Sequence, residues 1–503
     1  MAVHMNTFSV KTYLLGAGSG LGLMLANIVV AIFFMPYLFG YYGAEGFGVI
    51  SMSMHFFSAL ALFCSSVSVA LNRFYVVDFN KGNKYLSGLF IYSLLIVLVL
   101  SVLGVAAAIA IGELYIPLIT AKVDDFSTLF YLMALSSILF SFQQVFSVVF
   151  YVNHEIYLQN ILQIFNVIVR VLLVVLSIFF GLAIASYGWA YLISSFLVFC
   201  VVIIYSRKLG VSTDIKFNAM PKVKLEGFRK VMLWLGINNF SALLIRNVDL
   251  FIVGYYLLGE TQGLYALALQ WIVVIRVFSE ALSVSISPKI VETSRDVPGR
   301  LYESVQLASK AIGSIVAYPV MFLMVFTSEI WELWLGAEGA FMSDYLFIQV
   351  LLLSVLFYGC FFPYVYSQVA LNKVRVPALV GIFIGVLYVL ALVVIGEFGF
   401  GLEYFALSLV LAITLKNTIF TPIYGAYITG SDYKTALSPV LRVAGMALLS
   451  CITLLSCGHL FGGAVTGLLF SFFIGGVIYL SVCCFVVFSR QERSIAYQLW
   501  KKT

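Results

Sequence analysis

The sequence predicts an all-α polytopic membrane protein, and two observations carry this prediction. Of the 503 residues, 63% are hydrophobic and 10% are charged, whereas a soluble domain is about half apolar and a quarter charged. The apolar residues form long continuous runs, and not the alternating segments of about ten residues that transmembrane β-strands show. We therefore expect helices that cross a lipid bilayer.

Breaks at glycine, proline and clusters of charge divide the chain into about 14 apolar segments. Each has about the 20 residues that a helix needs to cross the hydrocarbon core. The expected spans are 14–39, 46–71, 85–111, 128–150, 157–180, 184–205, 231–258, 263–287, 311–328, 345–370, 376–396, 402–428, 437–458 and 462–488.

Basic residues are distributed unevenly between the connections on the two sides of the membrane. If the N-terminus lies in the cytoplasm, the connections on the opposite side hold a single basic residue, Lys122. Those connections carry acids instead, among them Glu113, Glu260 and Glu332. Because cytoplasmic loops carry an excess of lysine and arginine, this asymmetry predicts an even number of spans with both termini in the cytoplasm.

The sequence offers no place for catalytic or metal chemistry. The largest expected outer connection, Glu329–Asp344, has 16 residues, too few for an extramembrane catalytic domain. The seven cysteines lie in or beside apolar runs, and the histidines form no metal-binding spacing with acids or cysteines. No P-loop is present. We therefore expect a transporter that is not an enzyme, with no metal and no cofactor.

The longest polar segment, Ser206–Lys230, lies between the sixth and seventh spans and is basic. It is typical of a cytoplasmic linker. A weak internal match, Ser66–Val69 with Ser283–Ile286, favours two halves of the same orientation. The expected organisation is an N-terminal six-helix half (1–205), the linker (206–230), a C-terminal six-helix half (231–428), and two extra helices with a tail (429–503).

Six ionisable residues lie within the apolar runs, four of them basic and two acidic. They are Arg170, Arg246, Asp249, Arg276, Glu280 and Lys416. A charge at the centre of a bilayer costs at least about 2.5–3.5 kcal/mol on insertion scales, so each residue is a candidate for function. A lumen with this balance of charge would attract an anion.

Polar side chains follow one face of the fifth span. Gln159, Gln163, Asn166 and Arg170 are spaced at i, i+4, i+7 and i+11, which places them in one stripe. The stripe can line a cavity. Its uncharged members can instead make contacts between helices, as polar residues in membranes often do.

The seventh and eighth spans carry further polar residues. Asn239 lies seven residues before Arg246, and Asp249 follows at i+3, while Arg276 and Glu280 are spaced at i, i+4. Each acid can pair with the arginine on its own helix and simply hold that helix in place. Alternatively, Asp249 or Glu280 titrates and couples transport to protons.

Arg170 and Lys416 have no acidic neighbour within their own span. They are therefore the strongest candidates for contact with an anion. An arginine would suit a pyrophosphate, because its planar fork can donate two hydrogen bonds to one phosphate group.

Three motifs strengthen this interpretation. Gly40–Met52 reads GYYGAEGFGVISM, Arg246–Trp271 reads RNVDLFIVGYYLLGETQGLYALALQW, and Ala370–Leu379 reads ALNKVRVPAL. Together with about 14 spans and a basic middle linker, they resemble the polysaccharide transporters of the MATE-like (MOP) flippase superfamily. The resemblance covers nearly the whole chain.

The resemblance implies a flippase that moves an undecaprenyl-diphosphate-linked oligosaccharide from the inner to the outer leaflet of a bacterial or archaeal cytoplasmic membrane. Such export serves the assembly of O-antigen, capsule or exopolysaccharide. The family is described as having a cationic central cavity and working by alternating access. The residues expected to bind substrate here are Arg170, Arg246, Arg276, Lys416, Asn166, Gln163 and Asn239, with Asp249 and Glu280 in coupling or ion pairs.

The implied partners are the lipid-linked oligosaccharide, membrane lipids, and a polysaccharide polymerase with a chain-length regulator; no nucleic acid is expected. Other branches with 14 spans flip the lipid-linked peptidoglycan precursor, which stays an alternative. A cation-coupled multidrug exporter of the same fold is a further alternative. Such exporters usually have 12 spans and would favour acidic lumen residues, so the extra helices and the basic residues favour a lipid-linked anion.

Overall fold

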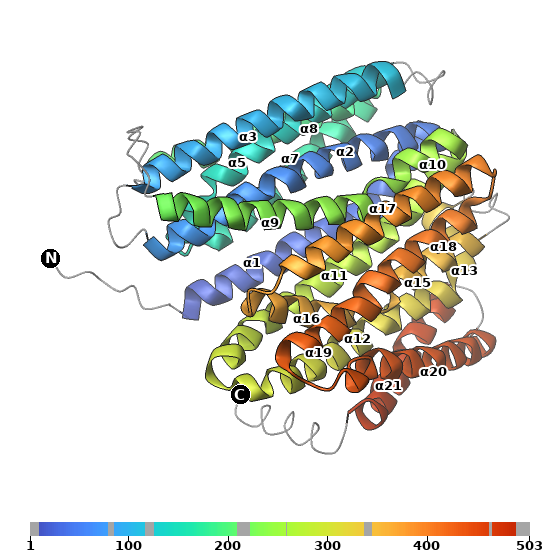
Figure 1. Ribbon diagram of the computed structural model, residues 1–503. Coiled ribbons are helices and arrows are strands. Elements are labelled where there is room, and N and C mark those ends of the chain that lie inside the picture. Colours follow the sequence, from blue (N-terminus) through green and yellow to red (C-terminus); the bar gives the residue numbers. More distant parts are fainter. Residues whose placement is uncertain are drawn as a thin grey trace. The chain divides into compact units, whose positions relative to one another are not determined.

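The structure is a computed structural model that describes residues 10–78, 85–115, 125–208, 222–257, 259–336, 345–461 and 465–488. Within these ranges the chain forms helices and turns, with no β-strand (Figure 1). In the described chain, 13 helical segments are long and apolar enough to cross a membrane. This confirms the predicted fold class of an all-α polytopic membrane protein.

The first of these segments, Gly18–Tyr75, is a special case. It has 58 residues, far more than the roughly 20 that one crossing needs. Gly43 interrupts it with a φ of 70° and a ψ of 175°, a backbone conformation that glycine adopts without steric cost. The interruption falls between the expected spans 14–39 and 46–71. Counted as two crossings, the segment brings the described total to the 14 expected.

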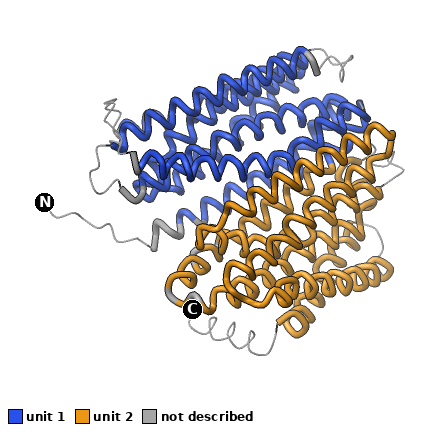
Figure 2. The backbone as a smooth tube through the Cα atoms, in the orientation of Figure 1, with its two compact units in different colours: residues 1–267 blue, residues 268–503 orange. Residues whose placement is uncertain are grey.

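The chain divides into two compact units, unit 1 (Met1–Leu267) and unit 2 (Ala268–Thr503), shown in Figure 2. The division falls within a single long helix, α11. The predicted six-helix halves, 1–205 and 231–428, concern internal repetition rather than packing, and they stay a prediction. Of the predicted linker, the first residues end α8 and residues from Lys222 onward begin α9, while 209–221 lie outside the described residues.

Unit 1 contains α1 (Val10–Val29), η1 (Val30–Phe34), α2 (Met35–Asp78), α3 (Tyr85–Ala110), η3 (Ile111–Tyr115), α5 (Phe126–Phe146), α6 (Val148–Val152), α7 (Ile156–Phe179), α8 (Ala185–Lys208), α9 (Lys222–Arg246), α10 (Asp249–Leu257) and the start of α11 (Glu260–Asp296). The α5 helix packs against α2, α3 and α8. The α7 helix packs against α1 and α8, and α9 packs against α2.

A hydrophobic core holds these helices together. It includes Leu71 of α2, Val148 of α6 and Phe228 of α9, all fully buried. Within it the hydroxyl of Tyr75 donates a hydrogen bond to the carbonyl oxygen of Leu86 at 2.9 Å. A buried hydroxyl needs such a partner, so this bond fixes the end of α2 against the start of α3.

Unit 2 contains the rest of α11, η4 (Pro298–Arg300), α12 (Leu301–Val325), α13 (Thr327–Leu335), α15 (Leu346–Leu356), α16 (Tyr358–Ala370), α17 (Arg375–Glu397), α18 (Leu402–Ile413), η5 (Thr414–Phe420), α19 (Thr421–Thr429), η6 (Tyr433–Thr435), α20 (Ser438–Phe461) and α21 (Val465–Val486). The α12 helix packs against α15, α16 and α20, and α18 packs against α15 and α17.

The two C-terminal helices, α20 and α21, are part of this unit. Both pack against α12 and against each other. The hydroxyl of Tyr479 on α21 donates to the carbonyl oxygen of Ser314 on α12 at 2.9 Å. The predicted extra pair is therefore anchored to unit 2 by a buried hydrogen bond as well as by apolar packing.

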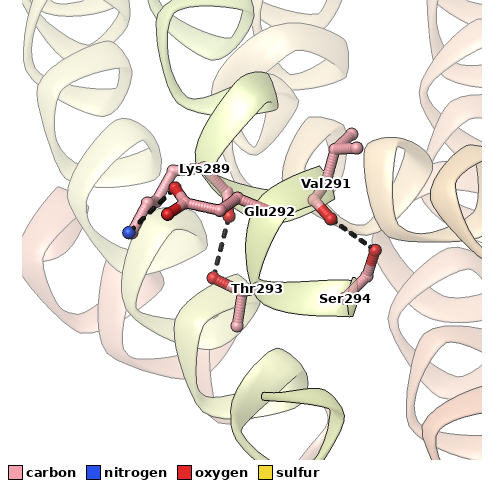
Figure 3. A network of polar contacts seen from close by, with 5 residues as sticks. All are labelled: Lys289, Val291, Glu292, Thr293 and Ser294. Atoms are coloured by element: carbon pink, nitrogen blue, oxygen red, sulfur yellow. Dashed lines mark hydrogen bonds and ion pairs between the residues drawn. The ribbon is translucent and has the colours of Figure 1, made fainter. Parts of the chain in front are cut away.

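The α11 helix continues past its apolar part. Its 37 residues make it about 56 Å long at 1.5 Å per residue, longer than the roughly 30 Å hydrocarbon core. Its last turns carry four charged residues: Lys289, Glu292, Arg295 and Asp296. Figure 3 shows Lys289 paired with Glu292 at 3.0 Å and Thr293 donating to the carbonyl of Lys289. Such an exposed pair contributes little stability, but it marks this end of the helix as suited to water.

Candidate functional site

The α7 helix has a polar face and an apolar face. Its polar stripe, predicted from the sequence, lines a cavity of about 480 Å³ within unit 1, through Gln159, Gln163, Asn166 and Arg170. A second stripe, two residues further along the chain, is apolar and exposed: Ile161, Phe165, Ile168 and Leu172. A shift of two residues turns about 200° around a helix, so the two stripes face opposite ways. The polar face therefore turns inward and the apolar face suits lipid.

The cavity is lined by α1, α2, α5, α6, α7 and α8. Small-molecule sites usually have volumes of about 300–1,000 Å³, and this cavity falls within that range. Five further amide residues contribute to the lining: Asn27, Asn72, Gln143, Gln144 and Asn160. Among the described lining residues, Arg170 is the one charged side chain.

Arg170 lies over an aromatic ring. Its guanidinium carbon is 4.3 Å from the centroid of the Tyr191 ring on α8. The Tyr191 ring packs edge to face on Phe57, with ring centroids 5.7 Å apart, and the centroids of Phe57 and Phe140 are 5.6 Å apart. A cation over an aromatic face is stabilised by about 0.5–2 kcal/mol, more where water is excluded. The Tyr191 ring therefore stabilises the charge of Arg170 at this position.

Four amide oxygens in the cavity wall are buried and have no hydrogen-bond partner among the described residues. They belong to Asn72, Gln143, Gln159 and Asn166. Gln143 and Asn166 are only 2% and 6% exposed. Buried polar groups are nearly always paired, and an unpaired one costs about 1–3 kcal/mol. Four of them in one cavity point to a polar occupant.

Asn239 holds two helices together. Its side-chain nitrogen donates to the carbonyl oxygen of Leu62 at 2.7 Å and to the hydroxyl of Ser65 at 3.1 Å. These bonds tie α9 to α2, and Ser65 itself lines the cavity. Asn239 therefore makes a contact between helices, which was one of the two alternatives open from the sequence. Its role in binding substrate stays a prediction.

The seventh span is broken in its middle. The α9 helix ends at Arg246 and α10 begins at Asp249, so the two residues do not share the continuous helix expected from the sequence. The Asn247 amide donates to the carbonyl oxygen of His55 at 3.1 Å and to the hydroxyl of Ser58 at 2.6 Å. These bonds to α2 hold the broken backbone, because the side chain binds where the helix ladder stops. The ion pair between Arg246 and Asp249 stays a prediction.

Asp249 is 1% exposed at the start of α10. Its carboxyl group accepts hydrogen bonds from the Leu250 amide at 2.9 Å and from the Tyr265 hydroxyl at 3.1 Å. His55 lies close enough to act on it electrostatically. A carboxyl group at the first turn of a helix is favoured by the helix dipole, which explains how Asp249 is tolerated inside a span.

The remaining predicted charges belong to unit 2. Arg276 and Glu280 are half-buried on α11, and Glu280 acts electrostatically on Tyr366 of α16. Lys416 is half-buried in η5, a π-helical segment between α18 and α19. Pro422 lacks the amide hydrogen that a regular helix needs there, and the Thr421 hydroxyl donates to the Lys416 carbonyl oxygen at 2.8 Å. In membrane helices such π segments often mark functional positions.

The structure thus groups three of the seven predicted binding residues: Gln163, Asn166 and Arg170 line one cavity. The sequence analysis missed the cavity residues of α2 and α5, above all Asn72, Gln143 and Gln144. Two adjacent glutamines inside an apolar span were a usable signal, because the bilayer disfavours both. Among the described residues no group of three histidine, cysteine or acidic side chains could hold a metal ion.

Comparison with known proteins gives the family. Residues 17–294 match the family described as polysaccharide biosynthesis protein. The uncharacterized membrane protein EpsK of Bacillus subtilis (strain 168) is 23% identical over 498 residues, which cover 95% of this chain and 96% of EpsK.

Two solved structures share the fold. The lipid II flippase MurJ in its inward closed conformation has a TM-score of 0.65 at 16% identity, covering 94% of this chain and 97% of MurJ. An inward-facing multidrug resistance MATE family transporter of the MOP superfamily has a TM-score of 0.61 at 14% identity, covering 85% of this chain and 96% of that one. The family match spans more than half of the chain, so this chain belongs to the polysaccharide biosynthesis protein family, and it is a multi-pass membrane protein that shares its fold with MurJ and with the MATE transporter.

Proposed function

We propose that this protein moves an anionic, undecaprenyl-diphosphate-linked oligosaccharide from the inner to the outer leaflet of the cytoplasmic membrane for the assembly of surface polysaccharide. The observation that carries the proposal is the inward polar face of α7, which leads along a cavity to Arg170. No ion pair to Arg170 is present among the described residues. A cation so placed can bind the diphosphate of a lipid carrier without first leaving an acidic partner.

The predicted orientation agrees with loading from the cytoplasm. The connection between α6 and α7 is expected on the cytoplasmic side, and Tyr151 and Gln159 on either side of it line the cavity. Arg170 lies 14 residues after Ile156, or about 21 Å along the helix. In this proposal the head group enters from the cytoplasmic side and the lipid tail stays in the bilayer.

The other predicted residues have proposed roles as well. Arg246, Arg276 and Lys416 would contact the anionic head group at other stages of transport. The π-helical segment at Lys416 supports this for unit 2, because such segments are frequent at functional sites. Asp249 would keep the broken seventh span in register.

Flipping of the peptidoglycan precursor is a second candidate, and one observation favours it. The lipid II flippase MurJ covers 94% of this chain, whereas the MATE transporter covers 85%. The additional similarity agrees with a lipid-linked substrate. A sequence identity of 16% supports a shared fold but not a shared substrate. The experiment must therefore distinguish a lipid-linked oligosaccharide from the peptidoglycan precursor.

The test is deletion of the gene in its native host, followed by complementation. We expect loss of surface polysaccharide and accumulation of its lipid-linked repeat unit, both reversed by the wild type. Arg170→Ala and Lys416→Ala should fail to restore export, since each removes a charge that binds the diphosphate. Lys289→Ala is the matched control, because the side chain of this lysine is exposed and already paired with Glu292.

Other outcomes would replace the proposal. Arrest of peptidoglycan synthesis would assign the peptidoglycan-precursor function. Unchanged surface polysaccharide with raised sensitivity to cationic drugs would assign multidrug export. Full rescue by Arg170→Ala and Lys416→Ala would make both charges structural.

A further inference from the structure

The cavity of unit 1 is rich in groups that bind hydroxyls and poor in charge. Its lining combines amides from α2, α5 and α7 with four serines, Ser65, Ser68, Ser147 and Ser195. Some of these groups are already paired: the Ser68 hydroxyl donates to Gln144 Oε1 at 3.3 Å, and Asn160 donates to the Ser19 hydroxyl at 3.0 Å. The polar atoms that remain unpaired, and that an occupant of the cavity could bind, are therefore a defined set.

That set is the four buried amide oxygens of Asn72, Gln143, Gln159 and Asn166, which have no partner among the described residues. Their residues come from three helices and line one cavity. An amide oxygen only accepts hydrogen bonds, so an occupant must donate to it. A hydroxyl can donate. A phosphate oxygen without a proton only accepts.

The charge of the lining further restricts the chemical class of the occupant. Arg170 is the one charged residue among the described lining residues, so a cationic ligand would meet repulsion. A diphosphate carries more negative charge than one arginine balances. A neutral or weakly acidic group with many hydroxyls meets neither penalty.

The cavity wall also offers apolar faces. Phe57, Phe140 and Tyr151 line it, and Phe57 and Phe140 contact each other at 5.6 Å. A sugar ring presents hydroxyls at its edge and C–H groups on its faces. Aromatic rings with amides around them match both surfaces.

We propose that this cavity is a sugar-binding subsite, which recognises hydroxyl groups of the oligosaccharide, while Arg170 at the end of the polar stripe is one of the cations that bind the diphosphate. The proposal rests on the proposed function and adds its substrate specificity. Gln143 and Asn166 are the principal specificity residues, because they are the most deeply buried of the four. Arg170, at the end of the polar stripe, adjoins both parts of the substrate.

The experiment compares two probes on the purified full-length protein. One is the lipid-linked oligosaccharide extracted from the deletion strain, and the other is undecaprenyl diphosphate without sugar. Wild-type protein should bind the first at least about tenfold more tightly, which corresponds to one or two net hydrogen bonds. Gln143→Met and Asn166→Leu should lose most of this preference and keep the affinity for undecaprenyl diphosphate.

A matched control and a second pair of variants guard the result. Gln368→Met removes a buried glutamine of α16 that bonds to the Thr421 carbonyl at 3.4 Å, and it should keep the full preference. If a deeply buried variant fails to fold, Asn72→Leu and Gln159→Met remove the other two amide oxygens of the set, which belong to half-buried residues.

Equal binding of both probes by the wild type would overturn the subsite, and so would full preference in the variants. Neither result would contradict the proposed function if deletion of the gene still blocks export of the polysaccharide. Intact export after deletion would instead overturn the proposed function and, with it, this proposal.

Discussion

At the residue scale, the most informative side chain is Arg170, whose charge is stabilised by the aromatic ring of Tyr191 rather than by an acidic side chain. The sequence predicted its stripe correctly, because a spacing of i, i+4, i+7, i+11 places residues on one face of any helix. The stack on Tyr191 could not be predicted, because it joins α7 to α8 and depends on how those helices pack. Asn239 is a second example, since only the structure shows that it bonds to α2.

Arg170→Lys should separate charge from geometry. Lysine keeps the charge but cannot lie flat on Tyr191 or donate two parallel hydrogen bonds. We expect at least about a tenfold loss of export for Arg170→Ala and an intermediate loss for Arg170→Lys. The readout is surface polysaccharide at equal levels of protein in the membrane. Wild-type export by the lysine variant would mean that charge alone is needed.

Tyr265→Phe should destabilise unit 1. It removes the hydroxyl that donates to the buried Asp249 carboxyl at 3.1 Å and leaves that group short of a partner. The expected loss is about 1–3 kcal/mol, seen as a lower melting temperature in detergent. Tyr427→Phe, an exposed tyrosine of α19, is the control and should melt as the wild type does. Equal melting of Tyr265→Phe and wild type would show that the bond contributes nothing.

At the scale of elements, most spans were predictable, whereas the breaks within them were not. Hydropathy places the spans because the bilayer demands a minimum apolar length. The break between α9 and α10 falls in RNVD, which has neither glycine nor proline, and it depends on bonds from Asn247 to α2. The π-helical segment η5 depends on Pro422, but the proline alone did not reveal the kind of irregularity.

The start of α11 explains the glycine of its sequence motif. A Cβ on Gly263 would overlap the carbonyl oxygen of Ala44, and Gly48 also lies against this position. Gly263→Ala should therefore prevent the close contact of α11 with α2 and abolish stable folding of unit 1. Fluorescence size-exclusion chromatography of a tagged protein would detect this as aggregation.

Gly445→Ala is the matched control for this prediction. Gly445 lies in α20, and a Cβ there would meet nothing within 4 Å. It should elute as the wild type does, or with a small gain in stability from better helix propensity. A monodisperse Gly263→Ala protein would contradict the proposed steric role.

At the scale of the whole molecule, the fold class and number of crossings follow from the sequence, while the division into units does not. Apolar length and the position of lysine and arginine are local properties, so they can be read along the chain. The grouping of helices up to Leu267 into unit 1 depends on packing of α9 and α10 against α2, which sequence spacing does not encode. The orientation in the membrane stays a prediction.

Labelling the two ends of α7 tests that orientation. Ile156→Cys and Phe180→Cys place thiols at exposed positions at its start and its end. In a background with the exposed Cys484 replaced by serine, an impermeant thiol reagent added to spheroplasts should label Phe180→Cys only. Ile156→Cys should react after permeabilisation. The reverse pattern would place both termini outside.

The central claim is that the protein moves a lipid-linked oligosaccharide across the bilayer, and leaflet distribution tests it most directly. Spheroplasts depleted of the protein, or replete with it, are treated with periodate under conditions in which it does not cross the membrane, and the oxidised fraction of the lipid-linked repeat unit is measured. The account predicts that depletion protects the accumulated repeat unit, because it stays in the inner leaflet. Equal oxidation with and without the protein would contradict flipping and would place its action after translocation.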